Sequence, residues 1–231
     1  MPSDRLVTTD DWPEAELRAA VLAGDLVAVG ACWASVAEPQ DPALRAASYG
    51  WSVSDPRLVA AGLSAAWIWG ACSRPPLPHD CCVPAVERFR RRGAWTAVRE
   101  IALRADEVVE PAGVRVLTPA ATALDLLRTR RRFGDADAEA VRGLVAVSGV
   151  DADRLEALLA RSERLPMGRQ AQRRFRASGL GRRASGANGA AAGAREPGGS
   201  GSFVTGPGGG GPVVTGPGPG GAREGDPVGP T

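Results

Sequence analysis

The sequence predicts an α+β fold, and three observations lead to that class. Apolar residues recur at helical spacing in several segments, one of which opens at Thr118-Pro119, a favourable helix start. Short apolar segments with strand character, DCCVPAV, TAVREIALRA and GVRVLT, lie between the helical ones. From Gly179 onward the chain is mostly Gly, Pro, Ala and Arg, too poor in apolar side chains to form a core. We therefore expect a small sheet and a helical domain, followed by a disordered C-terminal tail.

The first forty residues predict a helix followed by a hairpin. Asp11 and Glu14 have the spacing of a capping box, which would begin the helix, and Gly24 fits its C-terminal stop. The next segment, DLVAVGACWASV, consists of two short apolar runs broken at Gly30, as in a small hairpin.

The helix that follows residue 118 has the clearest start signal. Thr118 can accept a hydrogen bond from a first-turn N–H, and Pro119 removes a donor that the helix does not need. The expected buried stripe of this helix comprises Leu117, Ala121, Leu124 and Leu127. Three further helices are expected over DADAEAVRGLVAVSG, DADRLEALLARSERL and MGRQAQRRFRAS.

The sequence allows two interpretations of the carboxylate of Asp125. It could pair with Arg128, three residues along the same helix, or join Glu107 and Glu110 in a carboxylate group. We favour the ion pair, because nothing in the sequence fixes the geometry of such a group. The sequence also contains neither a Gly-x-Ser-x-Gly elbow nor a phosphate-binding loop. We therefore expect a protein that is not an enzyme and needs no cofactor.

Charge is distributed unevenly along the chain. Residues 1–110 carry 11 Arg and 15 acidic residues, a net charge of −4, whereas residues 111–176 carry 13 Arg and 8 acidic residues, a net charge of +5. The basic half would favour a polyanion or an acidic protein partner. The acidic half argues against indiscriminate binding of nucleic acid.

Three arginine clusters are candidate sites for binding nucleic acid or a protein partner. They lie at the end of the helix after residue 118, in a loop between strands, and on the last basic helix. Their members are Arg128, Arg130, Arg131 and Arg132; Arg88, Arg90, Arg91 and Arg92; and Arg169, Arg173 and Arg174. The alternative for the first cluster is stabilisation of the negative helix end, and for the others a solvated surface. Only a contact to a polyanion predicts binding with strong salt dependence.

The cysteines and the one histidine raise the possibility of zinc. Cys72, His79, Cys81 and Cys82 lack the paired Cys-x₂₋₄-Cys spacing of structural sites, and adjacent Cys81 and Cys82 on a strand would point to opposite faces. We therefore expect small buried hydrophobic residues and no metal. No apolar run is long enough to cross a membrane, and no signal peptide is visible, so we expect a cytoplasmic protein without a membrane partner.

The order of the segments is similar to that of the actinobacterial AbiEi-family antitoxins. LRAAVLAGDLVAVGACWAS resembles the family's recognition helix and wing, LSAAWIWG its Ser-Ala-Ala helix, and CCVPAVERFRRRG its strand, proline and basic loop. RADEVVEPAGVRVLTPAATALDLLR resembles the family's Thr-Pro turn and Leu-Asp-Leu helix. The similarity covers roughly residues 12 to 176. The chain differs from the family pattern in two ways: its N-terminal part is shortened, and its Gly/Pro-rich tail is atypical.

This resemblance implies a transcriptional regulator and antitoxin of a type IV toxin–antitoxin system. An N-terminal winged helix would bind operator DNA, and the C-terminal domain would oppose a nucleotidyltransferase-like toxin. The implied domains are a partial winged-helix-like element at 1–40, an antitoxin-like α+β domain at 41–178 and the tail at 179–231. On the recognition helix, Glu14 and Glu16 would repel phosphate and Arg18 alone would favour it.

Two alternatives to this function remain. One is a protein-interaction module that has lost DNA binding. The other is a degenerate nuclease-associated protein.

Overall fold

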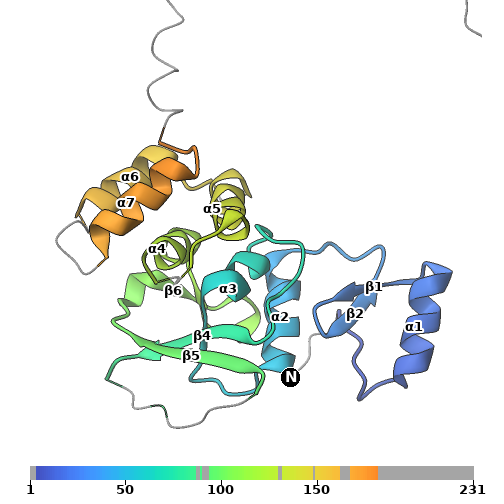
Figure 1. The fold of residues 1–231 in the computed structure, drawn as a ribbon. Helices are drawn as coiled ribbons and strands as arrows, with labels where there is room; N and C mark the ends of the chain where they lie inside the picture. The colour runs from blue at the N-terminus through green and yellow to red at the C-terminus, as the bar shows by residue number, and fades with distance from the viewer. Residues whose placement is uncertain are drawn as a thin grey trace, which may run out of the picture. The chain divides into compact units, whose positions relative to one another are not determined.

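The computed structural model describes residues 4–86, 89, 94–129, 132–147, 149–161 and 167–181 (Figure 1). Within this part of the chain, helices and short strands alternate along the sequence, and the strands form two sheets. The predicted α+β class is confirmed. The Gly/Pro-rich tail expected from Gly179 lies, from residue 182 onward, outside the described residues.

Residues 4–41 form a helix–hairpin segment. It consists of α1 (Glu14–Ala23) and the antiparallel pair β1 (Leu26–Val29) and β2 (Cys32–Ser35), with Gly30 at φ +62° in the turn. Val7 adds an isolated bridge to Trp33. The hairpin prediction and the stop at Gly24, which has φ +83°, are confirmed.

The predicted capping box is wrong. Residue Pro13 occupies the N-cap position of α1, and no side chain caps it. The carboxylate of Asp11 instead accepts hydrogen bonds from the N–H and the hydroxyl of Thr8, both at 2.8 Å. Asp11 therefore closes the turn before the helix, because Thr8 offers it two donors at once.

Five short strands form the second sheet, in the order β5-β4-β3-β7-β6. They are β3 (Val59–Ala60), β4 (His79–Pro84), β5 (Thr96–Ile101), β6 (Val108–Val109) and β7 (Val116–Leu117). β4 runs parallel to β5 and antiparallel to β3, β7 is parallel to β3, and β6 is antiparallel to β7. The 3-10 turns η1 (Ala105–Glu107) and η2 (Pro111–Gly113) border β6.

Helices complete two hydrophobic cores. The elements are α2 (Pro42–Ser52), α3 (Gly62–Ile68), α4 (Pro119–Thr129), α5 (Asp135–Val147), α6 (Ala152–Arg161) and α7 (Gly168–Ala177). One core joins the sheet, the hairpin, α2 and α3; the other lies among α3 to α7, where α6 and α7 run side by side (Figure 1). α3 contributes to both cores and so connects the sheet to the helical region. No described helix has the length and apolarity to cross a membrane.

The start of α4 follows the sequence prediction. The Thr118 hydroxyl accepts a hydrogen bond from the N–H of Ala121 at 3.3 Å, and Pro119 is the first helical residue. Leu117, Ala121 and Leu127 are buried as expected, while Leu124 is half-buried.

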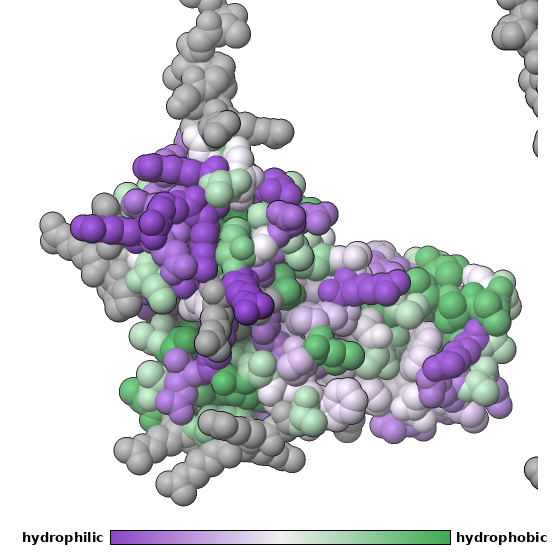
Figure 2. All heavy atoms as spheres, viewed as in Figure 1, coloured by the Kyte–Doolittle hydropathy of each residue, from purple (hydrophilic) through white to green (hydrophobic). Residues whose placement is uncertain are grey.

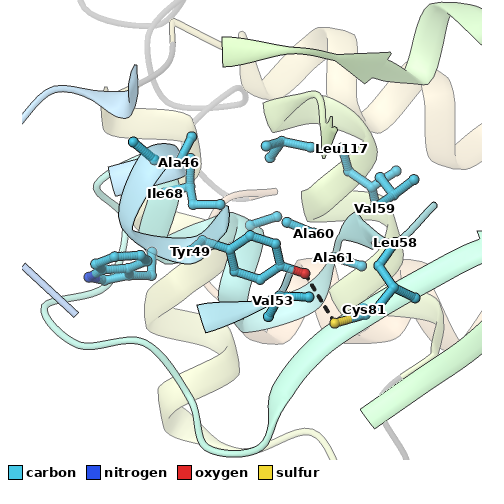
Figure 3. Close-up of a cluster of buried hydrophobic side chains, with 14 of the residues drawn as sticks. Ala46, Tyr49, Val53, Leu58, Val59, Ala60, Ala61, Ile68, Cys81 and Leu117 are labelled. Atoms are coloured by element: carbon cyan, nitrogen blue, oxygen red, sulfur yellow. Dashed lines mark hydrogen bonds between the residues drawn. The ribbon is translucent and has the colours of Figure 1, made fainter. Parts of the chain in front are cut away.

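Figure 3 shows the first core around Tyr49 of α2. The Tyr49 hydroxyl and the Cys81 sulfur are 3.0 Å apart and hydrogen bonded. Neither Cys81 nor its neighbour Cys82 is exposed to solvent. Both faces of β4 are therefore covered at these positions, and the two thiols fill core volume.

Candidate functional site

An ion pair between buried Asp125 and half-buried Arg99 lies where α4 meets the sheet. The guanidinium of Arg99 on β5 donates two hydrogen bonds to the carboxylate of Asp125 on α4, at 3.0 and 2.7 Å. The N–H of Gly62 and the hydroxyl of Thr129 donate to the same carboxylate, at 3.1 and 3.0 Å. The Thr129 hydroxyl shares its one proton with the Asp125 backbone carbonyl, which is nearer, at 2.7 Å. The side chain of Asp125 is only 5% exposed.

The expected pairing of Asp125 with Arg128 is wrong. Asp125 lies on the same face of α4 as buried Ala121, four residues earlier, so its carboxylate points toward the sheet rather than along the helix surface. Arg99 supplies the cation there. Glu107 does not join Asp125, because its carboxylate accepts from the N–H of Arg104 at 3.0 Å.

Asp80 on β4 lies beside this ion pair. Its carboxylate accepts from the N–H of Leu63 at 2.9 Å, and its N–H donates to the Ser64 hydroxyl, also at 2.9 Å. Gly62 has φ +52°, and a Cβ at this position would lie 2.6 Å from Asp80 Oδ2. Only glycine therefore lets the start of α3 approach the two carboxylates so closely. We call Gly62, Asp80, Arg99 and Asp125 the buried polar cluster.

Electrostatics in the buried polar cluster favour a fixed ion pair. Burial opposes the charge of Arg99, but the hydrogen bonds and charge of Asp125 outweigh burial and raise the pKa of Arg99. Burial, with the neighbouring Asp125 charge, raises the pKa of the Cys82 thiol to about 12. The thiol stays protonated at neutral pH, and the Asp125 carboxylate is held by Arg99 and the Gly62 N–H. This arrangement suits a structural role better than acid–base chemistry.

His79 and the cysteines form no metal-binding arrangement. His79 is buried and packs edge-on against Tyr49, with ring centroids 5.4 Å apart. Burial lowers the pKa of His79, so the imidazole is neutral at pH 7. Within the described residues, no three His, Cys, Asp or Glu side chains lie close enough to hold a metal ion. Burial also raises the pKa of Cys81, to about 11.

The arginines predicted on the last basic helix divide into two groups. Arg169 and Arg173 of α7 are exposed and lie one turn apart, and neither pairs with an acidic side chain of the described residues. Figure 2 shows hydrophilic side chains gathered over α6 and α7. Arg174 points inward instead: it donates to the Leu127 carbonyl at 2.8 Å and lies over the Phe133 ring at 5.2 Å.

The other predicted arginines differ in environment. Arg132 is exposed, whereas Arg128 is half-buried and its Nε has no hydrogen-bond acceptor in the described part of the chain. Arg18 is exposed on α1 but pairs with Glu14 at 2.7 Å. The remaining members of the predicted clusters lie outside the described residues: Arg88, Arg90, Arg91, Arg92, Arg130 and Arg131.

Sequence reasoning missed Arg99 and Asp80. A signal for them was present: Asp125 falls on the apolar stripe of its helix, and a carboxylate in that position needs a cation from another element. Two of the segments that carry the resemblance meet at this point, since Ser64 comes from one and Asp125 from another, and Asp80 directly precedes a third. Those segments therefore mark how the fold is held together.

Comparisons with known proteins identify a family for the chain. The family model described as the AbiEi antitoxin C-terminal domain matches residues 59–175. Among solved structures, the crystal structure of RV2827C protein from Mycobacterium tuberculosis is similar, with a TM-score of 0.42 and 22% sequence identity, over 75% of this chain and 72% of that one. No curated protein matches the chain.

Proposed function

Because the chain belongs to the family of AbiEi antitoxin C-terminal domains, we propose that it is the antitoxin of a type IV toxin–antitoxin system and opposes a nucleotidyltransferase-like toxin. The observation that carries the proposal is the extent of the family match, which spans the five-stranded sheet and the helices from α3 into α7. The proposed domains are the partial winged-helix-like element at 1–40, the antitoxin-like domain at 41–178 and the tail at 179–231. The protein would act in the cytoplasm.

The proposed mechanism is binding rather than catalysis. The buried carboxylate of Asp125 is engaged by groups of the fold itself, the Arg99 guanidinium and the Gly62 N–H. The outer face of α7, in contrast, presents the accessible guanidinium groups of Arg169 and Arg173. Arginines in this setting suit contact with carboxylates or phosphates. We propose that α7, together with exposed Arg132, contacts the partner.

Co-expression tests this function. The test begins with the genes beside this one: a nucleotidyltransferase-like protein encoded there is expressed in a bacterial host with and without the full chain, and growth is followed. We expect arrest with the toxin alone and growth with both proteins. The double variant Arg169→Ala/Arg173→Ala should restore less growth, whereas Arg104→Ala, an exposed arginine outside α7, should act like the unchanged chain. Arrest that the unchanged chain fails to relieve would refute the antitoxin function.

Operator DNA is the second candidate partner, favoured by the arginine spacing on α7. Arg169 and Arg173 are separated by about 6 Å along the helix axis, a spacing at which both can reach neighbouring phosphates. A gel shift with the DNA upstream of the gene, at two salt concentrations, tests this contact. Each phosphate contact removed should flatten the dependence of log K on log salt by about 0.9. No shift at low salt would leave a protein-interaction module without DNA binding.

A further inference from the structure

A cavity of about 380 Å³ lies beside the C-terminal half of α2. It is lined by the end of α2, by the link from α2 to β3, and by η2 with the residues that follow it. α2 and η2 pack closely because Gly50 has no side chain; a Cβ there would lie 2.8 Å from the Val114 side chain. Ala112 of the lining has φ +52°, a backbone conformation that alanine rarely adopts and that is often found at ligand sites. The volume is in the range of pockets that bind small molecules, roughly 300–1,000 Å³.

The cavity has an apolar floor. Tyr49, Val53 and Leu58 line it, and all are buried as members of the first core (Figure 3). Half-buried Trp51 and Val114 add to the apolar lining. Such a floor favours the apolar part of a ligand, which loses contact with water when it binds there.

Arg115, directly before β7, supplies a positive charge to the lining. Its guanidinium donates to the Arg57 carbonyl at 3.3 Å and pairs with no carboxylate of the described residues. Asp55 also lines the cavity, but Arg57 donates to both of its carboxylate oxygens, at 3.0 and 2.7 Å. The charge of Arg115 is therefore available to attract an anion.

Other polar groups of the lining also favour an acceptor ligand. In the part of the chain that the structure describes, neither the Ser54 hydroxyl nor the Trp51 indole N–H makes a hydrogen bond. Both can donate to an oxygen of a ligand. The C-terminal end of α2 contributes about half a negative charge, which is smaller than the full positive charge of Arg115.

We propose that this cavity binds a small carboxylate with an aromatic or branched apolar body. The carboxylate would pair with Arg115, because the planar guanidinium offers two donors that match its two oxygens. The apolar body would lie on Val53 and Leu58. Nucleic acid does not suit this cavity, because a phosphate backbone needs several cations along its length. The ligand site goes beyond the antitoxin function and does not depend on it.

Titration of the full chain with phenylacetate, indoleacetate and isocaproate tests the site. We expect saturable binding of at least one of them by calorimetry, with a Kd below about 1 mM and a Tm that rises with its concentration. The alcohol with the same apolar body should bind at least about tenfold more weakly, because it lacks the charge. Acetate, which lacks the apolar body, should show no saturation. Failure of all three carboxylates to saturate, or equal affinity for the alcohol, would overturn the proposal.

Variants show whether the carboxylate binds in this cavity. Arg115→Gln should weaken binding at least about tenfold, because it removes the charge. Ser54→Trp should abolish binding, because the exposed serine lines the cavity and a large ring there would fill it. The matched control is Arg104→Gln, an exposed arginine outside the cavity, whose Kd should change less than about twofold.

Urea titration shows that each variant is folded. Unchanged affinity in folded Arg115→Gln or in folded Ser54→Trp would overturn the proposal, because the carboxylate would then bind elsewhere. If Arg115→Gln does not fold, Ser54→Trp alone decides.

Discussion

The helices α1 and α7 have the same length, ten residues, but differ in what they bury and in what they expose. Leu17 is the buried side chain among the described residues of α1, whereas α7 buries Gly168, Ala171 and Phe175. α1 carries acidic residues in its first turn, and α7 carries arginines along its length. The family pattern implies that α1 is the recognition helix, yet the positive charge lies on α7. Position in a family pattern and chemical suitability for a partner are therefore separate questions.

The two helices also differ in how strongly packing stabilises them. α7 packs into the second core, which it shares with α3 to α6, and is also held by the inward-pointing Arg174, whereas α1 contacts mainly the hairpin beside it. A helix held by a buried aromatic ring tolerates little change at that ring. A helix whose outer side chains contact only solvent tolerates much change there. Substitutions of buried side chains in α7 should therefore lower stability strongly, and substitutions on the outer face of α1 should lower it little.

Phe175→Ala should have the largest effect. Phe175 is 2% exposed at the centre of the second core, so its loss leaves a cavity between α7 and its neighbours. We expect the free energy of unfolding to fall by about 4 kcal/mol, measured by urea titration with circular dichroism. Leu22→Ala on α1 should change it by less than about 0.5 kcal/mol. Equal losses from the two variants would contradict the contrast between the helices.

Asp125→Ala should have the next largest effect. It removes the carboxylate that joins β5, α3 and α4, and it leaves the Arg99 guanidinium and the Gly62 N–H without their acceptor. We expect a loss of about 3 kcal/mol in the same urea titration. Asp106→Ala is the matched control, because its ion pair with Arg104 is exposed and should contribute less than about 0.5 kcal/mol. A loss of that small size from Asp125→Ala would show that the buried polar cluster does not hold sheet and helices together.

Features set by neighbouring residues could be predicted from the sequence. The start of α4 follows from Thr118 and Pro119, because a side-chain cap acts within one turn. The hairpin follows from two apolar runs broken at Gly30, and the end of α1 from Gly24. The same local logic failed at Asp11, where a competing pair of donors on Thr8 took the carboxylate.

Features set by distant residues could not be predicted. Arg99 and Asp125 are 26 residues apart in sequence and meet only because β5 joins the sheet beside β4, in parallel. No local sequence pattern predicts that two strands such as β4 and β5 pair in parallel. The arginines of α7 give a second example, in which the sequence did not predict which side chain would face solvent. Arg173 and Arg174 are adjacent in sequence, but one faces solvent and the other caps the Leu127 carbonyl.

Asp41→Ala should lower stability less than Phe175→Ala and Asp125→Ala do; it lies at the boundary of the helix–hairpin segment. The Asp41 carboxylate caps α2 by accepting from the Leu44 N–H at 2.8 Å, and it pairs with Arg5 at 3.0 Å. The Leu44 hydrogen bond, aided by Arg5, lowers the pKa of Asp41. We expect a loss of about 1 kcal/mol at pH 7, measured by urea titration.

The pH dependence of that loss follows from the direction of the pKa shift. Because the folded pKa lies below the unfolded one, the contribution of Asp41 is complete above the ordinary aspartate value of about 3.9. It fades as the pH falls through the lower folded pKa, so the unchanged chain and Asp41→Ala should converge there. Asp41→Asn is the control, since asparagine caps as well but does not titrate in this range. The difference in stability between Asp41→Asn and Asp41→Ala should stay constant with pH. If the difference between the unchanged chain and Asp41→Ala also stays constant with pH, the charged form of Asp41 is not what stabilises the fold.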